Sequence, residues 1–335
     1  MRRYLITGIT GFVGPNLANH LIKRGDIVFG LVRTKGSELE IKDIVPDNHF
    51  KQITFLYGDF TKKEDMDKIF KENKFDGVFH VGAFTHPPTS FTEPEKAYEA
   101  NYLGTKNIVD AIKVYQRDCA LMYCSSAEVY GIVEEKDQPI TEHTQLRPAN
   151  PYGMTKALGD VYVLSHASIK AEPFNIKAFV TRAFSHTGLR RASNFSVSSD
   201  AYQLVKIKKG LQEPVINIGT LSSLRPVMDV KDCVRAYTIL MEMAIKGDER
   251  VIGEIFTICG DRLFSMRELL DKMLEHTQLK GKVKEFLDLK LVRKIDIPVQ
   301  FCDDSKFRNL TGFKQEKDVL EDTLPDLLNY WEEKL

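Results

Sequence analysis

The sequence has no excess of charge of either sign and no long apolar segment. Lysine plus arginine and aspartate plus glutamate both number 47, so the formal net charge is zero. A chain without a basic excess is poorly suited to holding a nucleic acid or an anionic membrane, and we expect neither as a partner. No apolar run approaches the roughly 20 residues that a membrane-spanning helix needs. The first apolar segment runs directly into a glycine motif, so we expect no signal peptide.

Cysteine pairs and metal-ligand spacings are missing as well. The five cysteines are odd in number and scattered, without a Cys-x-x-Cys pair. This pattern argues against a disulfide framework or a zinc site and is typical of a reducing cytoplasm, where we expect the protein to work. The histidines lack the His-x-x-x-His and Glu-x-x-His spacings of metal ligands, so we expect no metal.

Short apolar segments alternate with longer amphipathic ones over the first half of the chain. The pattern predicts strands at Tyr4–Thr7, Ile27–Val32, Ile53–Tyr57, Gly77–Val81 and Leu121–Ser125. It predicts helices at Val13–Arg24, Glu64–Lys71 and Glu95–Tyr115. The strands are apolar on both faces, as in a parallel sheet covered on each side. We therefore expect an α/β fold with a doubly wound, Rossmann-like parallel sheet.

A glycine motif follows the first predicted strand and opens the first predicted helix. Its spacing is Gly-x-x-Gly-x-x-Gly, in place of the commoner Gly-x-Gly-x-x-Gly. Glycines here allow a tight turn and a close approach of the backbone to a pyrophosphate, to which the helix N-terminus offers free N–H groups. The motif predicts a dinucleotide site, and a glycine-rich turn without a ligand is the alternative. The residues expected around the dinucleotide are Gly8, Thr10, Gly11, Phe12, Val13, Gly14, Arg33, Asp59, Phe60, Val81, Gly82, Ala83, Tyr152 and Lys156.

The end of the second predicted strand bears on the choice of dinucleotide. An acid there would bind the ribose 2′-hydroxyl of NAD. Arg33 stands there instead, followed by a threonine and a lysine, and the first acid is Glu38. A cation and a hydroxyl suit the 2′-phosphate of NADP, which is the expected cofactor; NAD, with Arg33 as a solvated surface charge, is the alternative. Asp59 is placed either to accept from an adenine amino group or to cap a helix over Lys62–Phe70.

The alternation becomes irregular after Phe184, where loops, short strands and helices follow one another. We interpret residues 1–183, joined by part of 215–250, as the dinucleotide-binding domain. Residues 184–335 then form mainly a smaller, discontinuous C-terminal lobe that binds the substrate.

A tyrosine four residues before a lysine puts both side chains on one face of a helix. Four such pairs occur, namely Tyr102/Lys106, Tyr152/Lys156, Tyr202/Lys206 and Tyr330/Lys334. Only Tyr152 follows a helix-start signal and comes shortly after a serine, Ser126, that ends an apolar strand. Ligands bind beyond the carboxyl ends of the strands in such a sheet, so Ser126 and Tyr152 are expected to meet in one cleft. The other three pairs are interpreted as solvated helix faces.

This arrangement predicts an oxidation or reduction at a sugar carbon. The pKa of a free tyrosine side chain is about 10. We expect the Lys156 ammonium and an oxidised nicotinamide to lower the pKa of Tyr152. The phenolate could then accept a proton from a sugar hydroxyl, held by Ser126, while a hydride leaves the same carbon.

These motifs resemble the extended short-chain dehydrogenase/reductase family that modifies nucleotide sugars, and the resemblance runs over most of the chain. Besides the glycine motif, Ser126 and the Tyr152/Lys156 pair, it includes the stretches 101–105 and 124–131. Within the family, the segments 7–11, 90–95 and 182–191 are similar to enzymes acting on GDP-hexoses, the GDP-mannose 4,6-dehydratases and the GDP-4-keto-6-deoxymannose reductases.

The resemblance implies a role for Glu128, which stands where the dehydratases place the base that takes the C5 proton. In their reaction C4 is oxidised, the C5 proton is removed, water leaves C6, and the hydride returns to C6. An exposed loop glutamate is the alternative, and because the reductases can also carry an acid at this position, Glu128 by itself does not separate the two activities. Ala127 replaces the polar residue usual in dehydratases. The chain length and the arginine pair at 190–191 favour the dehydratase slightly, although other segments are more similar to the reductases.

A nucleoside diphosphate needs cations and hydrogen-bond donors. The expected substrate-binding residues are Ser185, Arg190, Arg191, Asn194 and Arg225. A surface ion pair is the alternative for each arginine. We expect a GDP-sugar as the partner and, by resemblance, a homodimer or a dimer of dimers. A non-catalytic dinucleotide sensor on the same fold is the competing class, against which the intact Ser126, Tyr152 and Lys156 argue.

Overall fold

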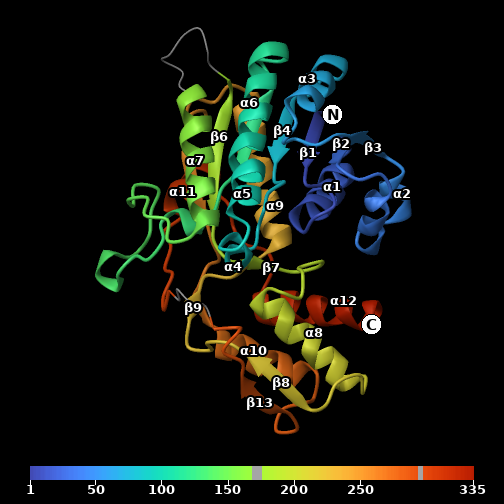
Figure 1. Cartoon of the computed structure of the whole chain (residues 1–335), viewed down its shortest axis with the longest axis vertical. Coiled ribbons are helices and arrows are strands. Elements are labelled where there is room, and N and C mark those ends of the chain that lie inside the picture. The colour runs from blue at the N-terminus through green and yellow to red at the C-terminus, as the bar shows by residue number, and fades with distance from the viewer. Residues whose placement is uncertain (168–175, 293–296) are drawn as a thin grey trace.

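The computed structural model of the chain describes residues 1–167, 176–292 and 297–335. These residues form a parallel sheet, with helices on both faces, and a smaller lobe beyond one end of the strands (Figure 1). The sheet strands are β1 (Arg3–Thr7), β2 (Ile27–Val32), β3 (Ile53–Tyr57), β4 (Gly77–His80), β5 (Ala120–Cys124), β6 (Ala178–Ala183) and β11 (Ile255–Ile258). Their order is β11-β6-β5-β4-β1-β2-β3, and every neighbouring pair is parallel. The predicted doubly wound, Rossmann-like sheet is confirmed.

Two apolar cores cover the two faces of the sheet. On one face pack α1 (Val13–Lys23), α9 (Val230–Ile245) and α11 (Ser305–Thr311), and on the other α3 (Lys63–Glu72), α6 (Gly104–Tyr115) and α7 (Pro151–His166). Short helical segments join these elements at Ser37–Asp43, Asp47–Phe50 (α2), Pro87–Ser90 (α4), Pro94–Tyr98 (α5), Glu99–Leu103, Ala127–Val129, Glu135–Asp137 and Val319–Thr323. None of the helices in the described ranges is long and apolar enough to cross a bilayer.

The smaller lobe has an apolar core of its own, formed mainly by three helices. Its elements are α8 (Ser196–Lys208), β8 (Val215–Ile218), α10 (Met266–His276), β13 (Lys284–Leu287) and α12 (Leu324–Lys334), with the two-residue strands β7 (His186–Thr187), β9 (Leu224–Arg225), β10 (Met228–Asp229) and β12 (Phe264–Ser265). The chain returns to the sheet with α9, inside the segment 215–250 expected to do so. It returns again with β11 and α11, which lie beyond that segment. The sequence did not predict this return, since a strand of four residues such as Ile255–Ile258 carries little periodic signal.

A buried ion pair joins α7 to the sheet. The side chains of Asp160 (α7) and Arg182 (β6) are 1% and 3% exposed, and Arg182 Nε donates to Asp160 Oδ2 at 2.9 Å. Arg182 also donates to the Tyr130 hydroxyl at 3.1 Å. Burial raises the pKa of Asp160, and the charge of Arg182 acts in the opposite direction. Arg182 therefore offsets part of the cost of burying the carboxylate.

We expect Asp160→Ala to lower the free energy of unfolding by about 3–5 kcal/mol, because the Arg182 guanidinium would remain buried without a counter-ion. Urea denaturation measures the change. Asp326→Ala is the matched control, since Asp326 pairs with Lys231 at the surface, where both side chains are about 40% exposed. Its expected loss is below about 1 kcal/mol. Equal losses in the two variants would contradict the argument.

Candidate active site

The glycine motif forms the turn between β1 and α1. Gly8 has a φ of +70°, and a Cβ on it would lie 2.5 Å from the Cα of Gly82. A Cβ on Gly14 would lie 2.3 Å from the carbonyl oxygen of Gly8. Side chains cannot be accommodated at these contacts, so the backbone of the loop and the start of α1 is left open at the carboxyl edge of the sheet. This cradle fits a dinucleotide pyrophosphate.

The loop is tied to the end of β4 at the point where the strand order reverses. The backbone N–H of Gly82 donates to the Thr7 hydroxyl at 3.0 Å, and that hydroxyl lies 2.7 Å from His80 Nδ1. Burial lowers the pKa of His80 to about 3, so the imidazole is neutral and serves as a hydrogen-bonding group of the core. Val81 and Ala83 flank Gly82 beside this reversal, which is where doubly wound sheets bind their ligands.

The other residues predicted for the dinucleotide lie along the same edge. Arg33 is exposed immediately after β2. Asp59 accepts hydrogen bonds from the backbone N–H and the hydroxyl of Thr61, at 2.9 and 2.8 Å, and so stabilises the turn before α3. The ring of Phe60 packs against the backbone of Gly104. A Cβ on Gly104 would lie 2.3 Å from a carbon of that ring. Asp59 therefore has a local structural role, whether or not it also contacts an adenine.

The start of α7 positions two functional groups at once. The Asn150 side-chain oxygen accepts from the backbone N–H of Gly153 at 2.8 Å and caps the helix. The same amide donates to Glu128 Oε2 at 2.8 Å. The carboxylate of Glu128 is thereby held against the helix that carries Tyr152.

Ser126, Tyr152 and Lys156 meet at the carboxyl end of β5, as predicted. Tyr152 and Lys156 are 8% and 3% exposed, and Ser126 lies near enough to Tyr152 to lower the pKa of its phenol. Lys156 Nζ donates to the carbonyl oxygen of Cys124 at 2.7 Å. The backbone N–H of Tyr152 donates to the Ser90 hydroxyl at 3.1 Å, which fixes the first turn of α7.

The protonation of Tyr152 differs from the expectation. Burial raises the pKa of Tyr152, the hydrogen bond from Ser126 and the charge of Arg191 lower it, and Glu128 raises it. Burial also lowers the pKa of Lys156. In the protein alone the phenol is therefore neutral. Arg191 is a side-chain cation that favours the phenolate and that the sequence argument did not name for this role.

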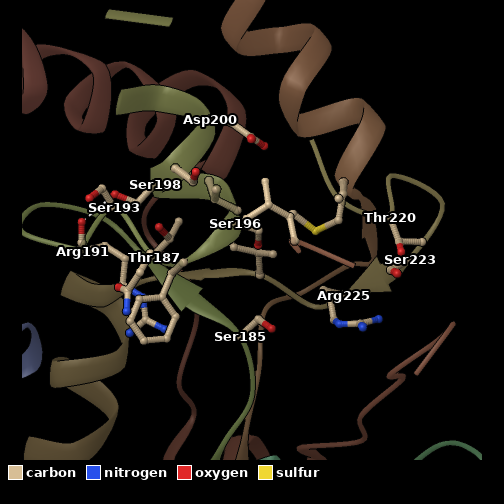
Figure 2. Close-up of a pocket in the computed structure, with 18 of the residues that line it drawn as sticks. Ser185, Thr187, Arg191, Ser193, Ser196, Ser198, Asp200, Thr220, Ser223 and Arg225 are labelled. Atoms are coloured by element: carbon tan, nitrogen blue, oxygen red, sulfur yellow. Dashed lines mark hydrogen bonds between the residues drawn. The ribbon is translucent and has the colours of Figure 1, made fainter. Parts of the chain in front are cut away.

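A pocket of about 370 Å³ lies between the sheet and the smaller lobe (Figure 2). Ser185, Arg191, Asn194 and Arg225, for which the sequence analysis expects a role in substrate binding, all line it. Sequence reasoning did not single out several further polar residues of the wall, which are Thr187, Ser193, Ser196, Ser198, Asp200, Thr220 and Ser223. Small hydroxyl residues are common in loops and helix starts, so they carried no signal.

Arg191 connects this pocket to the glycine loop. Its guanidinium carbon lies 4.8 Å from the ring centre of Phe12 and 3.5 Å from that of Phe195. Phe12 belongs to the loop and Phe195 precedes α8, so one cation is held between the dinucleotide side and the substrate side.

Arg190 does not line the pocket, and its predicted role in substrate binding is corrected. Its guanidinium donates to the carbonyl oxygens of Gly11 and Thr10, both at 2.9 Å, and to Asp43 Oδ2 at 2.7 Å. The backbone of Arg190 is left-handed, with φ of 71°, which turns this side chain away from that of its neighbour. Arg190 therefore positions the glycine loop.

The same Asp43 carboxylate binds the end of the chain. The Tyr330 hydroxyl donates to Asp43 Oδ2 at 2.9 Å, and Lys334 Nζ lies 3.1 Å from that oxygen. The Tyr330/Lys334 pair is thus a structural contact of α12, although a solvated helix face was expected.

No group of three or more His, Cys, Asp or Glu side chains that could hold a metal occurs in the part of the chain that the structure describes.

The fold and the site define an enzyme of the extended short-chain dehydrogenase/reductase class. A glycine loop at the strand reversal and a Ser-Tyr-Lys cluster on the neighbouring edge are its hallmarks, and both are present. The chain belongs to the family described as GDP-mannose 4,6 dehydratase, whose family model matches residues 5–323. The family expected from the sequence is confirmed.

Individual relatives carry two different activities. The GDP-6-deoxy-D-mannose reductase of Pseudomonas aeruginosa is 25% identical, over 100% of this chain and 98% of its own. The human GDP-mannose 4,6 dehydratase is 29% identical, over 92% of this chain and 86% of its own. Among solved structures, RMD from Pseudomonas aeruginosa complexed with NADPH matches with a TM-score of 0.82, 24% identity and full coverage of both chains.

Proposed function

We propose that the protein is an NADP-dependent GDP-hexose 4,6-dehydratase. The observation that carries this proposal is the position of Glu128, which Asn150 holds at the start of α7 and which lies near enough to Tyr152 to raise its pKa. A phenol and a carboxylate side by side supply two proton-transfer groups, which is what a combined oxidation and dehydration needs. The family, and the dehydratases and reductase among its relatives, support a GDP-sugar as the substrate.

Ser126, Glu128 and Tyr152 have different roles in the proposed reaction. NADP on the glycine loop would supply the hydride chemistry, taking hydride from C4 and returning it at C6. Tyr152 accepts the proton of the C4 hydroxyl, which Ser126 holds by a hydrogen bond. The C4 ketone makes the C5 hydrogen acidic, and Glu128 removes it as a proton. The C5–H electron pair forms the C5=C6 double bond while the C6 hydroxyl leaves, and the acid formed at Glu128 protonates the departing oxygen. When the hydride is returned at C6, C5 takes up one proton, which is balanced by the proton that Tyr152 took from the C4 hydroxyl and releases again.

A GDP-4-keto-6-deoxyhexose reductase is the second candidate, and two observations favour it. Ala127 leaves the site without the additional polar donor usual in dehydratases. Burial keeps Tyr152 protonated in the protein alone, which suits a phenol that gives its proton to a C4 ketone. The intact Ser126, Tyr152 and Lys156 argue against the third candidate, a sensor without activity.

One assay separates the three candidates. Purified protein is incubated with GDP-mannose and a catalytic amount of NADP, and the sugar is followed by mass. Loss of one water without net consumption of cofactor supports the dehydratase. Stoichiometric oxidation of NADPH with a GDP-4-keto-6-deoxyhexose supports the reductase. If neither compound is turned over, the result supports the third candidate, the sensor without activity.

The NADP preference rests on the exposed Arg33 at the end of β2. We expect Arg33→Ala to weaken NADPH binding about tenfold, because a charge-assisted contact with the 2′-phosphate contributes on the order of 1.5 kcal/mol. Fluorescence titration measures the affinity. NADH is the internal control, since it lacks that phosphate and its affinity should not change. A parallel loss for both dinucleotides would contradict the assignment.

We infer a homodimer, or a dimer of dimers, assembled through α6 and α7. Met154, Leu158 and Val161 recur on one face of α7 and are 44%, 39% and 61% exposed. An exposed apolar stripe of this kind is typical of an interface.

A cytoplasmic location is inferred from the five cysteines, all of which are free thiols.

A further inference from the structure

Asp200 is a buried acid in the wall of the pocket, and the proposed mechanism does not use it. It lies in the second turn of α8 and is 6% exposed. Among the described residues no hydrogen bond or ion pair reaches its carboxylate. Buried carboxylates are normally paired, because an unpaired one is costly in free energy. The pocket itself is the open side from which a partner could come (Figure 2).

The surrounding charges do not replace such a partner. The pKa of Asp200 is raised to about 8, mainly by burial and also by the charge of Glu285, whereas Arg267 acts in the opposite direction. Arg267 is already bound to Glu285 through two contacts of 2.6 Å. The acid is therefore poised between its neutral and charged forms, and donors from a ligand would favour the carboxylate.

The position of Asp200 along the pocket indicates which part of the ligand it meets. In Figure 2 Asp200 and Ser185 lie toward opposite ends, with Arg191 and Arg225 on the two sides between them. Ser185 follows β6, so its end is the catalytic one, and the two arginines suit a diphosphate. A nucleoside diphosphate sugar laid along this axis places its base beside Asp200.

Apolar side chains near Asp200 suit the faces of a flat ring. Val197 lies three residues before Asp200 and so on the same face of α8, and Leu221 and Met266 also line the pocket. Apolar walls with a single acid at one point are what a heteroaromatic base needs, since its faces are apolar and its edge is polar.

We propose that Asp200 recognises the substrate's base as guanine, its carboxylate accepting hydrogen bonds from the N1–H and the 2-amino group. The proposal rests on the proposed function in that the ligand is a nucleoside diphosphate sugar. Guanine presents two adjacent donors. Adenine and cytosine present one amino donor next to an acceptor nitrogen, and uracil presents one N–H between two acceptor oxygens. A carboxylate accepts from both donors of guanine and meets an acceptor on each of the others.

The test compares nucleoside diphosphates that differ only at position 2 of the purine. Isothermal titration is run with GDP, with IDP, which lacks the 2-amino group, and with XDP, which carries an oxygen there. We expect the wild-type protein to bind GDP at least tenfold more tightly than IDP or XDP. We expect Asp200→Asn to weaken the binding of GDP about 10- to 100-fold. The affinity for XDP should rise relative to that for GDP, because the amide offers one acceptor and one donor. Asp326→Asn, outside the pocket, is the control and should leave the order unchanged.

The outcomes separate this inference from the proposed function. Equal affinities of the wild-type protein for GDP and IDP, or an unchanged GDP affinity in Asp200→Asn, would overturn the role of Asp200 and leave a GDP-sugar enzyme possible in other respects. Binding of NADPH without binding of any nucleoside diphosphate would overturn both. A thermal melt confirms that the isosteric variant is folded, and NADPH affinity should be the same in all three proteins.

Discussion

Tyr152→Phe is expected to lower turnover of the sugar about 10²- to 10⁴-fold while NADPH still binds. The substitution removes only the hydroxyl, which is the group that transfers the proton at C4, and general acid–base help of this kind contributes rate factors of that size. Tyr152 is buried on α7, which is anchored by Asn150, so the ring and the helix should stay in place. Steady-state kinetics and a titration with NADPH measure the two effects separately.

Tyr162→Phe is the matched control for this prediction. Tyr162 lies on the same helix, but its hydroxyl donates to Asp110 Oδ1 at 2.8 Å, whereas the phenol of Tyr152 lies near Ser126. Its removal should leave the kinetics unchanged. Near-normal turnover in Tyr152→Phe would show that another group moves the proton, and the proposed mechanism would have to be abandoned.

Glu128→Gln is expected to lower dehydration about 10²- to 10⁴-fold and to leave reduction of a supplied 4-keto sugar largely intact. Glutamine keeps the size of the side chain and its contact with Asn150 but cannot remove the C5 proton. Reduction at C4 needs only Tyr152 and Ser126, so it should survive. Mass analysis of the sugar measures dehydration, and NADPH oxidation measures reduction.

Glu135→Gln, in an exposed loop segment, is the control for this variant and should change neither activity. A similar loss of both activities in Glu128→Gln would indicate that Glu128 positions the site and is not the base. In that case the reductase becomes the better assignment.

The sheet and the glycine loop could be predicted because their signals are local. Each of β2 and β3 is a run of apolar residues, and both were predicted with the bounds that the structure has, Ile27–Val32 and Ile53–Tyr57. The Ser126 and Tyr152 cluster could be predicted because strand ends and a helix start are readable along the chain. The order of the strands then places those ends at one edge.

The roles of the two adjacent arginines could not be predicted, because they depend on one backbone angle. Arg190 and Arg191 are equivalent in sequence, yet the left-handed φ of 71° at Arg190 sends one side chain to the glycine loop and the other to the pocket. Glu128 and Asn150 are 22 residues apart, and their contact exists only after folding. The one local signal for Asp200 was an acid on a helix face shared with Val197 and Leu204.

The shared carboxylate of Asp43 makes the last helix a reporter of dinucleotide occupancy. It accepts from Arg190, which also binds the carbonyl oxygens of the loop, and from Tyr330 on α12. Because coupling between sites is reciprocal, a ligand that orders the loop must also restrain α12. Hydrogen exchange of the α12 amides should accordingly slow when NADPH is present, and Tyr330→Phe, which removes the contact with Asp43, should weaken NADPH binding.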